Sequence, residues 1–338
     1  KTGRGGESMA GQSTWRKLLT MGTAACLFLT GCGAFDAGSS SGEENLTVLT
    51  IGTADSGGTM YAVGSAIAQA ITDGESSIKI NLGASTGSAM NVRGLAGGEI
   101  DLGLVSGDVA YAAYHCQDVF AQPVEGLRAV AAIYISSSNW LALESQGVEY
   151  VHDLMGKRIG VGPQESTTEL SARTAVKVLG LDQNGTQLIN CGLGDGARMV
   201  GQGGLDAIHG FSGAPVGGLM GLAKEKPCTL LKYTQEELDG ILEENQLYRS
   251  VVIPAGTYAG QEEDVTTFGV KCLLCVDESM EDLLVYRLTQ EIWAATDRLS
   301  EEHPAMQEMR NREFVCQDLP IPLHPGAREF YEDQRVLQ

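Results

Sequence analysis

Three short segments of this sequence combine glycines with small hydroxyl side chains, and each directly precedes a stretch with helical spacing of apolar residues. They are residues 54–61, residues 83–88 with Asn91 one turn further on, and residues 163–168. The first N–H groups of a helix lack partners within the helix and carry partial positive charge. Such helix starts suit a carboxylate or a phosphate, and glycine allows it to approach the backbone. The alternative is that each Ser or Thr only caps its own helix.

These segments predict binding of a small anion or an amino acid. A hydrogen bond to a charged group contributes about 1.5–3 kcal/mol, so several together reach the roughly 8 kcal/mol of micromolar binding without a buried arginine. We therefore expect Arg93, Arg173 and Arg198 to lie at the solvated surface. The candidate ligand-binding residues are Ser56, Gly57, Gly58, Thr59, Tyr61, Thr86, Ser88, Asn91, Ser106, Tyr134, Ser166, Thr167, Thr168, Phe211 and Pro215.

An enzymatic interpretation depends on Ser85. Residues 83–87 fit the Gly-x-Ser-x-Gly pattern of a hydrolase nucleophile, but residues 38–42 fit it too, which shows how little the pattern alone means. None of the histidines has the setting of a catalytic base, and no His, Cys and carboxylate residues have the spacing of a metal site. We therefore predict a binding protein that is not an enzyme and has no metal or cofactor. A serine hydrolase using Ser85 is the alternative.

The elements that must position these residues occur twice in the same order. Strand-like segments at residues 46–53, 78–82 and 101–105 alternate with helical ones, and residues 158–162, 187–191 and 206–211 repeat the layout. This pattern predicts an α/β fold of two Rossmann-like lobes with mainly parallel sheets, joined by a hinge. Ligands of such sheets bind beyond the carboxyl ends of the strands, so the three segments would meet in one cleft. We expect one lobe to comprise residues 46–138 and about 265–338, and the other about 139–264.

The N-terminal region has the pattern of a lipoprotein signal. Arg16 and Lys17 precede an apolar stretch, and Leu29-Thr30-Gly31-Cys32 fits a lipobox. We expect residues 1–31 to be upstream residues and a signal peptide, Cys32 to be acylated, and residues 32–45 to form a flexible tether. The protein would then be extracytoplasmic and lipid-anchored to the cell membrane. An ordinary signal peptide with an incidental cysteine is the alternative.

Charge and cysteine content narrow the choice of partners further. The formal net charge is −20, which excludes nucleic-acid binding through the phosphates. Cys272 and Cys275 lie in the apolar run 268–276, where strand positions three apart face opposite sides. We therefore expect them to be buried free thiols.

Four further motifs indicate a family. Residues 51–61, 108–111, 253–258 and 319–327 together resemble the TAXI-type solute-binding subunits of TRAP transporters, and the resemblance covers nearly all of residues 46–333. It implies the type II periplasmic-binding-protein architecture and binding of small carboxylates such as glutamate, glutamine or 2-oxoglutarate. It also implies delivery to a TRAP membrane permease driven by an ion gradient, and a structural role for His324.

Two departures from the family pattern concern the ligand. Ser106-Gly107 replaces Gln-Ser before the motif at 108–111, and residues 164–168 replace a Gly-Ser-Gly-Thr stretch. Glu165 thereby places a carboxylate near the expected anion site. Either it faces solvent or it pairs with the amino group of an amino-acid ligand, which favours an amino acid. A surface interaction lipoprotein without a small ligand is the alternative from a different class.

Overall fold

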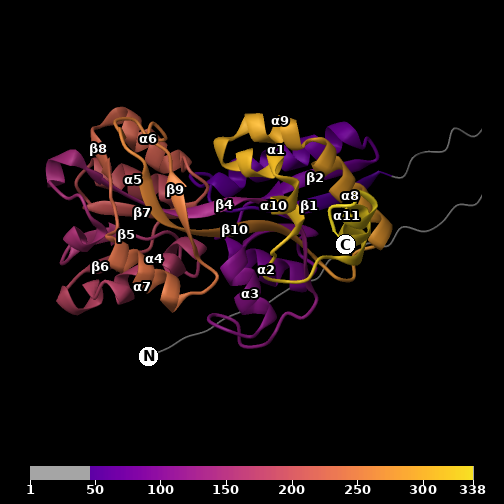
Figure 1. The fold of residues 1–338 in the computed structure, drawn as a ribbon, viewed down its shortest axis with the longest axis horizontal. Helices are drawn as coiled ribbons and strands as arrows, with labels where there is room; N and C mark the ends of the chain where they lie inside the picture. The colour runs from indigo at the N-terminus through magenta and orange to yellow at the C-terminus, as the bar shows by residue number, and fades with distance from the viewer. Residues whose placement is uncertain (1–45, 338) are drawn as a thin grey trace, which may run out of the picture. The chain divides into compact units, whose positions relative to one another are not determined.

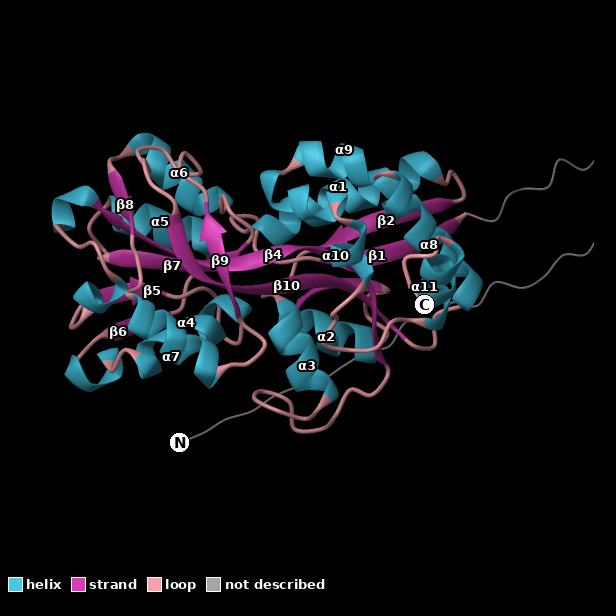
Figure 2. Cartoon of the chain, viewed as in Figure 1, coloured by secondary structure: helices cyan, strands magenta, loops and turns pink. Residues whose placement is uncertain are grey.

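The structure, a computed structural model, describes residues 46–337 (Figure 1). The predicted signal peptide, Cys32 and the tether lie outside the described residues. The described strands form one sheet whose main path runs β2-β1-β3-β10-β4-β7-β5-β6. Figure 2 shows helices on both sides of this sheet, as the α/β prediction requires.

The first α/β unit follows the predicted order. Its elements are β1 (Thr47–Gly52), α1 (Thr59–Gly74), β2 (Ile78–Gly83), α2 (Ser88–Ala96), β3 (Leu102–Ser106) and α3 (Gly107–Tyr114). β1 pairs in parallel with β2 on one side and with β3 on the other. In α1, Met60, Val63, Ile67 and Ile71 recur at helical spacing and are all buried against the sheet.

The second α/β unit repeats this topology. Its elements are β5 (Arg158–Gly160), α4 (Thr167–Val178), β6 (Gln187–Ile189), α5 (Leu193–Gly201), β7 (Ala207–Ser212), α6 (Gly217–Glu225), β8 (Cys228–Leu230), α7 (Gln235–Glu244) and β9 (Arg249–Ile253). β5 pairs in parallel with β6 and β7, as β1 does with β2 and β3. The prediction of two lobes with like topology is confirmed.

Two long strands, β4 (Leu127–Leu143) and β10 (Val265–Asp277), run between the two units (Figure 1). They pair with each other in antiparallel fashion; β10 also pairs with β3, and β4 with β7. Only residues 127–135 of β4 have the apolar pattern of a buried strand, because the polar run Ser136–Asn139 interrupts it. These four residues are nevertheless buried within the strand. The sheet is therefore mixed, with antiparallel strands at its centre.

The apolar cores divide along these two strands. On β4 the first core ends at Tyr134 and the second begins at Trp140. On β10, Phe268 and Val270 belong to the second core and Cys272 to the first. The cores therefore change between residues 134 and 140 on β4 and between residues 270 and 272 on β10, which makes these two strands the connection between the lobes.

The C-terminal helices pack on the first lobe. They are α8 (Asp282–Ala294), α9 (Thr296–Glu302), α10 (Arg312–Cys316) and α11 (Pro325–Asp333). His324 is fully buried, and its Nδ1 accepts a hydrogen bond from the Gly326 amide at the start of α11, at 3.2 Å. This contact agrees with the structural role expected for His324. Between residues 46 and 337, no helix combines the length and the apolar character needed to span a membrane.

The prediction that the two cysteines in the apolar run 268–276 are buried free thiols is confirmed. Cys272 and Cys275 are free thiols, fully buried in β10. Burial raises the pKa of the Cys272 thiol to about 12, so it stays protonated and unreactive. Register shifts of β10 against β4 fall next to both cysteines.

Candidate ligand-binding site

All three hydroxyl-rich segments meet at one small cavity between the lobes. The cavity has a volume of about 40 Å³. It is lined by Ala54, Asp55, Gly58, Met60, Thr86, Gly87, Pro163, Ser166, Thr167, Thr168, Leu193, Phe211 and Ser212. The sequence-based expectation that loops from both lobes converge is therefore met by the geometry.

The helices that start at this cavity differ in their capping. The N-caps of α1 and α2 are Gly58 and Gly87, which have no side chain to cap their helices, and the Thr59 amide at the start of α1 donates to Ser212 Oγ of the other lobe at 3.3 Å. Gly87 has φ of 122°, a conformation that side chains rarely adopt. Ser166 does cap α4, because its Oγ accepts a hydrogen bond from the Glu169 amide at 3.2 Å. The capping alternative thus applies to Ser166, while α1 and α2 leave their starts to other partners.

Several predicted hydroxyls hold the two lobes together. Thr59 Oγ1 donates to the Gly213 carbonyl at 2.5 Å, and Thr167 Oγ1 donates to Ser88 Oγ at 2.8 Å. The backbone closes the same contact, since the Gly218 amide donates to the Gly57 carbonyl at 2.9 Å. These residues line the interface between the lobes, so a ligand that enters must displace or bridge their contacts.

Asp55 joins the same interface, although the sequence analysis did not select it. Its Oδ2 accepts a hydrogen bond from the Leu193 amide, at the start of α5, at 2.6 Å. Its Oδ1 accepts one from the Gly57 amide at 3.3 Å. A carboxylate from the first lobe thus caps a helix of the second lobe. No local sequence signal reveals this contact, which spans 138 positions.

Two buried hydroxyls near the interface lack partners. Tyr134 and Ser136 on β4 are fully buried, and their hydroxyls make no hydrogen bond with any described residue. Burial raises the pKa of Tyr134 well above its ordinary value, so its hydroxyl remains a donor. The ring lies close to Gly213 and so close to Thr59, which contacts Gly213. Buried polar groups usually have partners, so this unmet capacity favours a polar ligand nearby.

Other predicted residues have structural contacts or lie away from the cavity. Asn91 Nδ2 donates to the Gly52, Thr53 and Leu104 carbonyls and so ties β1 to β3. Ser56 and Tyr61 are exposed, and Pro215 lines a different space of about 780 Å³. The structure therefore brings together Gly58, Thr59, Thr86, Ser88, Ser166, Thr167, Thr168 and Phe211, but not the whole predicted set.

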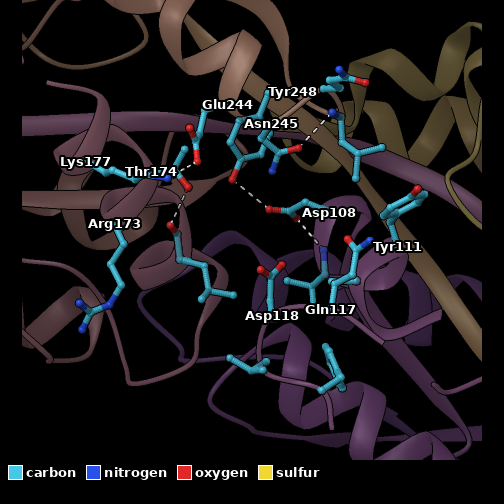
Figure 3. Close-up of a pocket in the computed structure, with 17 residues that line it drawn as sticks. Asp108, Tyr111, Gln117, Asp118, Arg173, Thr174, Lys177, Glu244, Asn245 and Tyr248 are labelled. Atoms are coloured by element: carbon cyan, nitrogen blue, oxygen red, sulfur yellow. Dashed lines mark hydrogen bonds and ion pairs between the residues drawn. The ribbon is translucent and has the colours of Figure 1, made fainter. Parts of the chain in front are cut away.

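Ser106 is fully buried and contacts Asp108, which lines a second space between the lobes. Its Oγ donates to Asp108 Oδ1 at 2.6 Å, and Tyr248 from the other lobe donates to Asp108 Oδ2 at 3.0 Å. Burial raises the pKa of Asp108. Asp108 and Tyr248 line a groove of about 700 Å³ together with Arg173 and Lys177 (Figure 3).

Glu165 is half-exposed to solvent and has a partner that neither of the two alternatives named. Its Oε2 pairs with Arg93 Nη1 at 2.7 Å, across the lobes and half-exposed to solvent. The pairing of Glu165 with the amino group of a ligand therefore no longer serves as an argument for an amino-acid ligand. Arg173 and Arg198 are exposed and paired with Glu169 and Asp195, in line with the surface positions predicted for them.

The hydrolase alternative gains no support from the geometry around Ser85. Its Oγ donates to the Thr53 carbonyl at 2.8 Å and accepts from the Gly87 amide at 3.0 Å, so its close partners are backbone groups. Burial lowers the pKa of His209 to about 3, and that ring contacts Ser138 instead. Within residues 46–337, no three potential metal ligands lie close enough to hold an ion.

Comparison with known proteins agrees with the fold. The sequence matches the NMT1-like family over residues 51–334. A periplasmic transporter of known structure is similar with a TM-score of 0.56 and 10% identity, covering 86% of this chain and 93% of that chain. A protein from Bordetella bronchiseptica RB50 is similar with a TM-score of 0.50 and 16% identity, covering 87% and 90%. For the periplasmic aliphatic sulphonate binding protein SsuA from Escherichia coli the values are 0.45 and 15%, with 85% and 83% covered.

The two α/β lobes, joined by β4 and β10, define the fold class of type II periplasmic binding proteins. The match covers most of the sequence, and the chain belongs to the NMT1-like family.

Proposed function

We propose that this protein is an extracytoplasmic solute-binding protein that captures a small carboxylate between its lobes and delivers it to a membrane permease. The observation that carries the proposal is the meeting of three helix starts at one interlobe cavity, two of them with glycine as the N-cap. Such starts offer N–H donors and positive partial charge to an anion. The type II binding-protein fold supports the same function.

Binding requires the lobes to move. A cavity of about 40 Å³ is far smaller than the roughly 300–1,000 Å³ of sites that hold small molecules, so a metabolite enters only when the lobes separate. β4 and β10 are the connections about which the lobes turn. On closure, Thr59 and Thr167 then face the ligand from opposite lobes, and the carboxylate lies at the starts of α1 and α2.

The finer parts of the proposal rest on sequence motifs. The resemblance at residues 51–61, 108–111, 253–258 and 319–327 supports a TRAP-type permease as partner and glutamate, glutamine or 2-oxoglutarate as the ligand class. The lipobox supports an anchor at Cys32, which would hold the protein at the membrane beside the permease.

A thermal-shift screen of the full chain, cleared of co-purified ligand, tests the function. Amino acids, mono- and dicarboxylates and sugars are compared at equal concentration. A ligand at a hundred times its dissociation constant stabilises the folded protein by about 2.7 kcal/mol, which the melting temperature reports. A selective shift with carboxylates supports the proposal. No shift with any carboxylate, on protein shown to be folded, contradicts it and favours an interaction protein without a small ligand.

A further inference from the structure

The cavity between the lobes has an unusual charge for an anion site. Of the described residues that line it, Asp55 alone carries a charged side chain. The nearby arginines Arg93 and Arg198 are paired with carboxylates outside the cavity. A ligand carboxylate therefore meets helix starts and hydroxyls, while any other charged group of the ligand meets Asp55.

The carboxylate of Asp55 keeps unused hydrogen-bonding capacity. An ionised carboxylate accepts about four hydrogen bonds. Asp55 accepts two, from Leu193 at 2.6 Å and from Gly57 at 3.3 Å, and its side chain is only partly buried. Its backbone carbonyl accepts from the Gly58 amide at 2.9 Å, which places it beside the start of α1.

Opening of the lobes exposes this carboxylate further. The Leu193 amide belongs to the second lobe, so the short contact to Oδ2 exists only while the lobes are together. When they separate, Asp55 stays on the first lobe, next to the helix start that receives the ligand carboxylate. A charge at this position costs desolvation on closure unless a partner of opposite charge is enclosed with it.

We propose that Asp55 is a specificity-determining residue that selects ligands with a cationic group beside their carboxylate, as in a free amino acid. The inference rests on the proposed function and narrows its ligand class. The ligand carboxylate lies at the starts of α1 and α2, and its ammonium group pairs with Asp55. A dicarboxylate without an amino group would bring a second negative charge toward Asp55, and like charges at this distance repel.

Calorimetry with matched ligand pairs tests the role of Asp55. Alanine is compared with propionate, and glutamate with glutarate, since each pair differs by the amino group. The variants are the parent, Asp55→Asn and Glu165→Gln. Asparagine keeps an acceptor for the Leu193 amide but removes the charge. Glu165→Gln is the matched control, because it removes another carboxylate that bridges the lobes, at 2.7 Å from Arg93 and outside the cavity lining.

For the pair whose amino acid binds, we expect the parent to bind the amino acid at least tenfold more tightly than its deaminated partner. Asp55→Asn should lower the affinity for the amino acid at least tenfold. The affinities for the amino acid and for its deaminated partner should then differ by only a fewfold. Glu165→Gln should change both members by the same factor.

Two results would overturn the inference while leaving the proposed function intact. One is a parent protein that binds the deaminated member as tightly as the amino acid. The other is an equal loss for both members in Asp55→Asn, which would make Asp55 only a contact between the lobes. If Asp55→Asn fails to fold by circular dichroism, the ratio within the parent decides. Absence of binding by any carboxylate rejects the inference together with the proposed function.

Discussion

Two of the spaces between the lobes differ in size and chemistry. The larger, about 700 Å³, is lined by charged side chains, of which Lys177 pairs with Glu244. Its buried carboxylate, Asp108, is satisfied by Ser106, Val109 and Tyr248. The smaller, about 40 Å³, has two helix starts with glycine N-caps, and buried hydroxyls without partners among the described residues lie near it. Of these two spaces, volume favours the larger groove as the ligand site, whereas unmet hydrogen-bonding capacity favours the smaller cavity.

This difference shows why volume alone does not identify a site in the cleft between two closed lobes. A closed cleft has little volume because its loops touch across the lobes. What identifies it is donors and acceptors that the protein itself does not use. In the larger groove, Asp108 and Lys177 bond to other groups of the protein. This arrangement suits a structural contact that guides closure of the lobes.

The largest effect is expected where a side chain would block closure of the small cavity. A Cβ at Gly57 would lie 2.5 Å from the backbone nitrogen of Gly194 in the opposite lobe. Gly57→Ala should cost about 1–3 kcal/mol in ligand binding, or roughly tenfold or more, without unfolding either lobe. Calorimetry with the screened ligand measures this loss. Gly221→Ala is the control, since a Cβ there meets open space, and an equal loss in both variants would contradict the account.

Removal of hydroxyl groups should affect ligand binding at the smaller cavity but not at the larger groove. Thr59→Val together with Thr167→Val should weaken binding by more than tenfold, because both hydroxyls contact the opposite lobe beside the cavity. Thr174→Val is the matched change in the larger groove, where the hydroxyl bonds only to the Leu170 carbonyl of its own helix. It should leave the affinity unchanged. Unchanged affinity in the double variant would remove the site assignment.

The buried carboxyl group of the larger groove should instead make the free energy of unfolding depend on pH. Burial raises the pKa of Asp108 above its ordinary 3.8, so the folded protein holds that proton more tightly than the unfolded chain. The free energy of unfolding should therefore fall as pH rises from below 3.8 through the raised pKa. Urea unfolding from pH 4 to pH 8 should show this fall in the parent and a weaker one in Asp108→Asn. Asp118→Asn, an exposed change in the same groove, should keep the parental profile.

The smallest effect is expected at the exposed ion pair between Arg93 and Glu165. Both side chains are about 40% exposed, at 44% and 42%, and such pairs contribute about 0–1 kcal/mol. Glu165→Gln should lower ligand affinity less than about fivefold, and less still at high salt, because salt screens exposed charges. Affinities measured at low and high salt check this. A loss above tenfold would make the ion pair, rather than the hydroxyls, the main contact that closes the lobes.

The sequence predicted the repeated lobes well because their signals are local. Apolar strands that end in glycine, followed by helical spacing, mark β1 and α1 as clearly as β5 and α4. The polar run Ser136–Asn139 gave no such signal, since its burial depends on β7 and β10 packing on either side. Local pattern therefore reveals the units but not the strands that join them.

The candidate site was predicted in part for the same reason. Glycines and hydroxyls before helices are visible in the sequence, and most of them meet at the cavity. The contacts of Asp55 with Leu193 and of Glu165 with Arg93 join residues 138 and 72 positions apart. Only the folded arrangement of the lobes determines these partners, so the sequence alone did not reveal the Arg93 partner of Glu165 and left Asp55 out.

A crystal structure of the protein with the ligand selected by the thermal-shift screen tests the central claim most directly. The account predicts that the ligand lies in the small interlobe cavity, with its carboxylate at the starts of α1 and α2 and with Thr59 and Thr167 on opposite sides. A ligand found in the larger groove beside Asp108 and Tyr248 would contradict it.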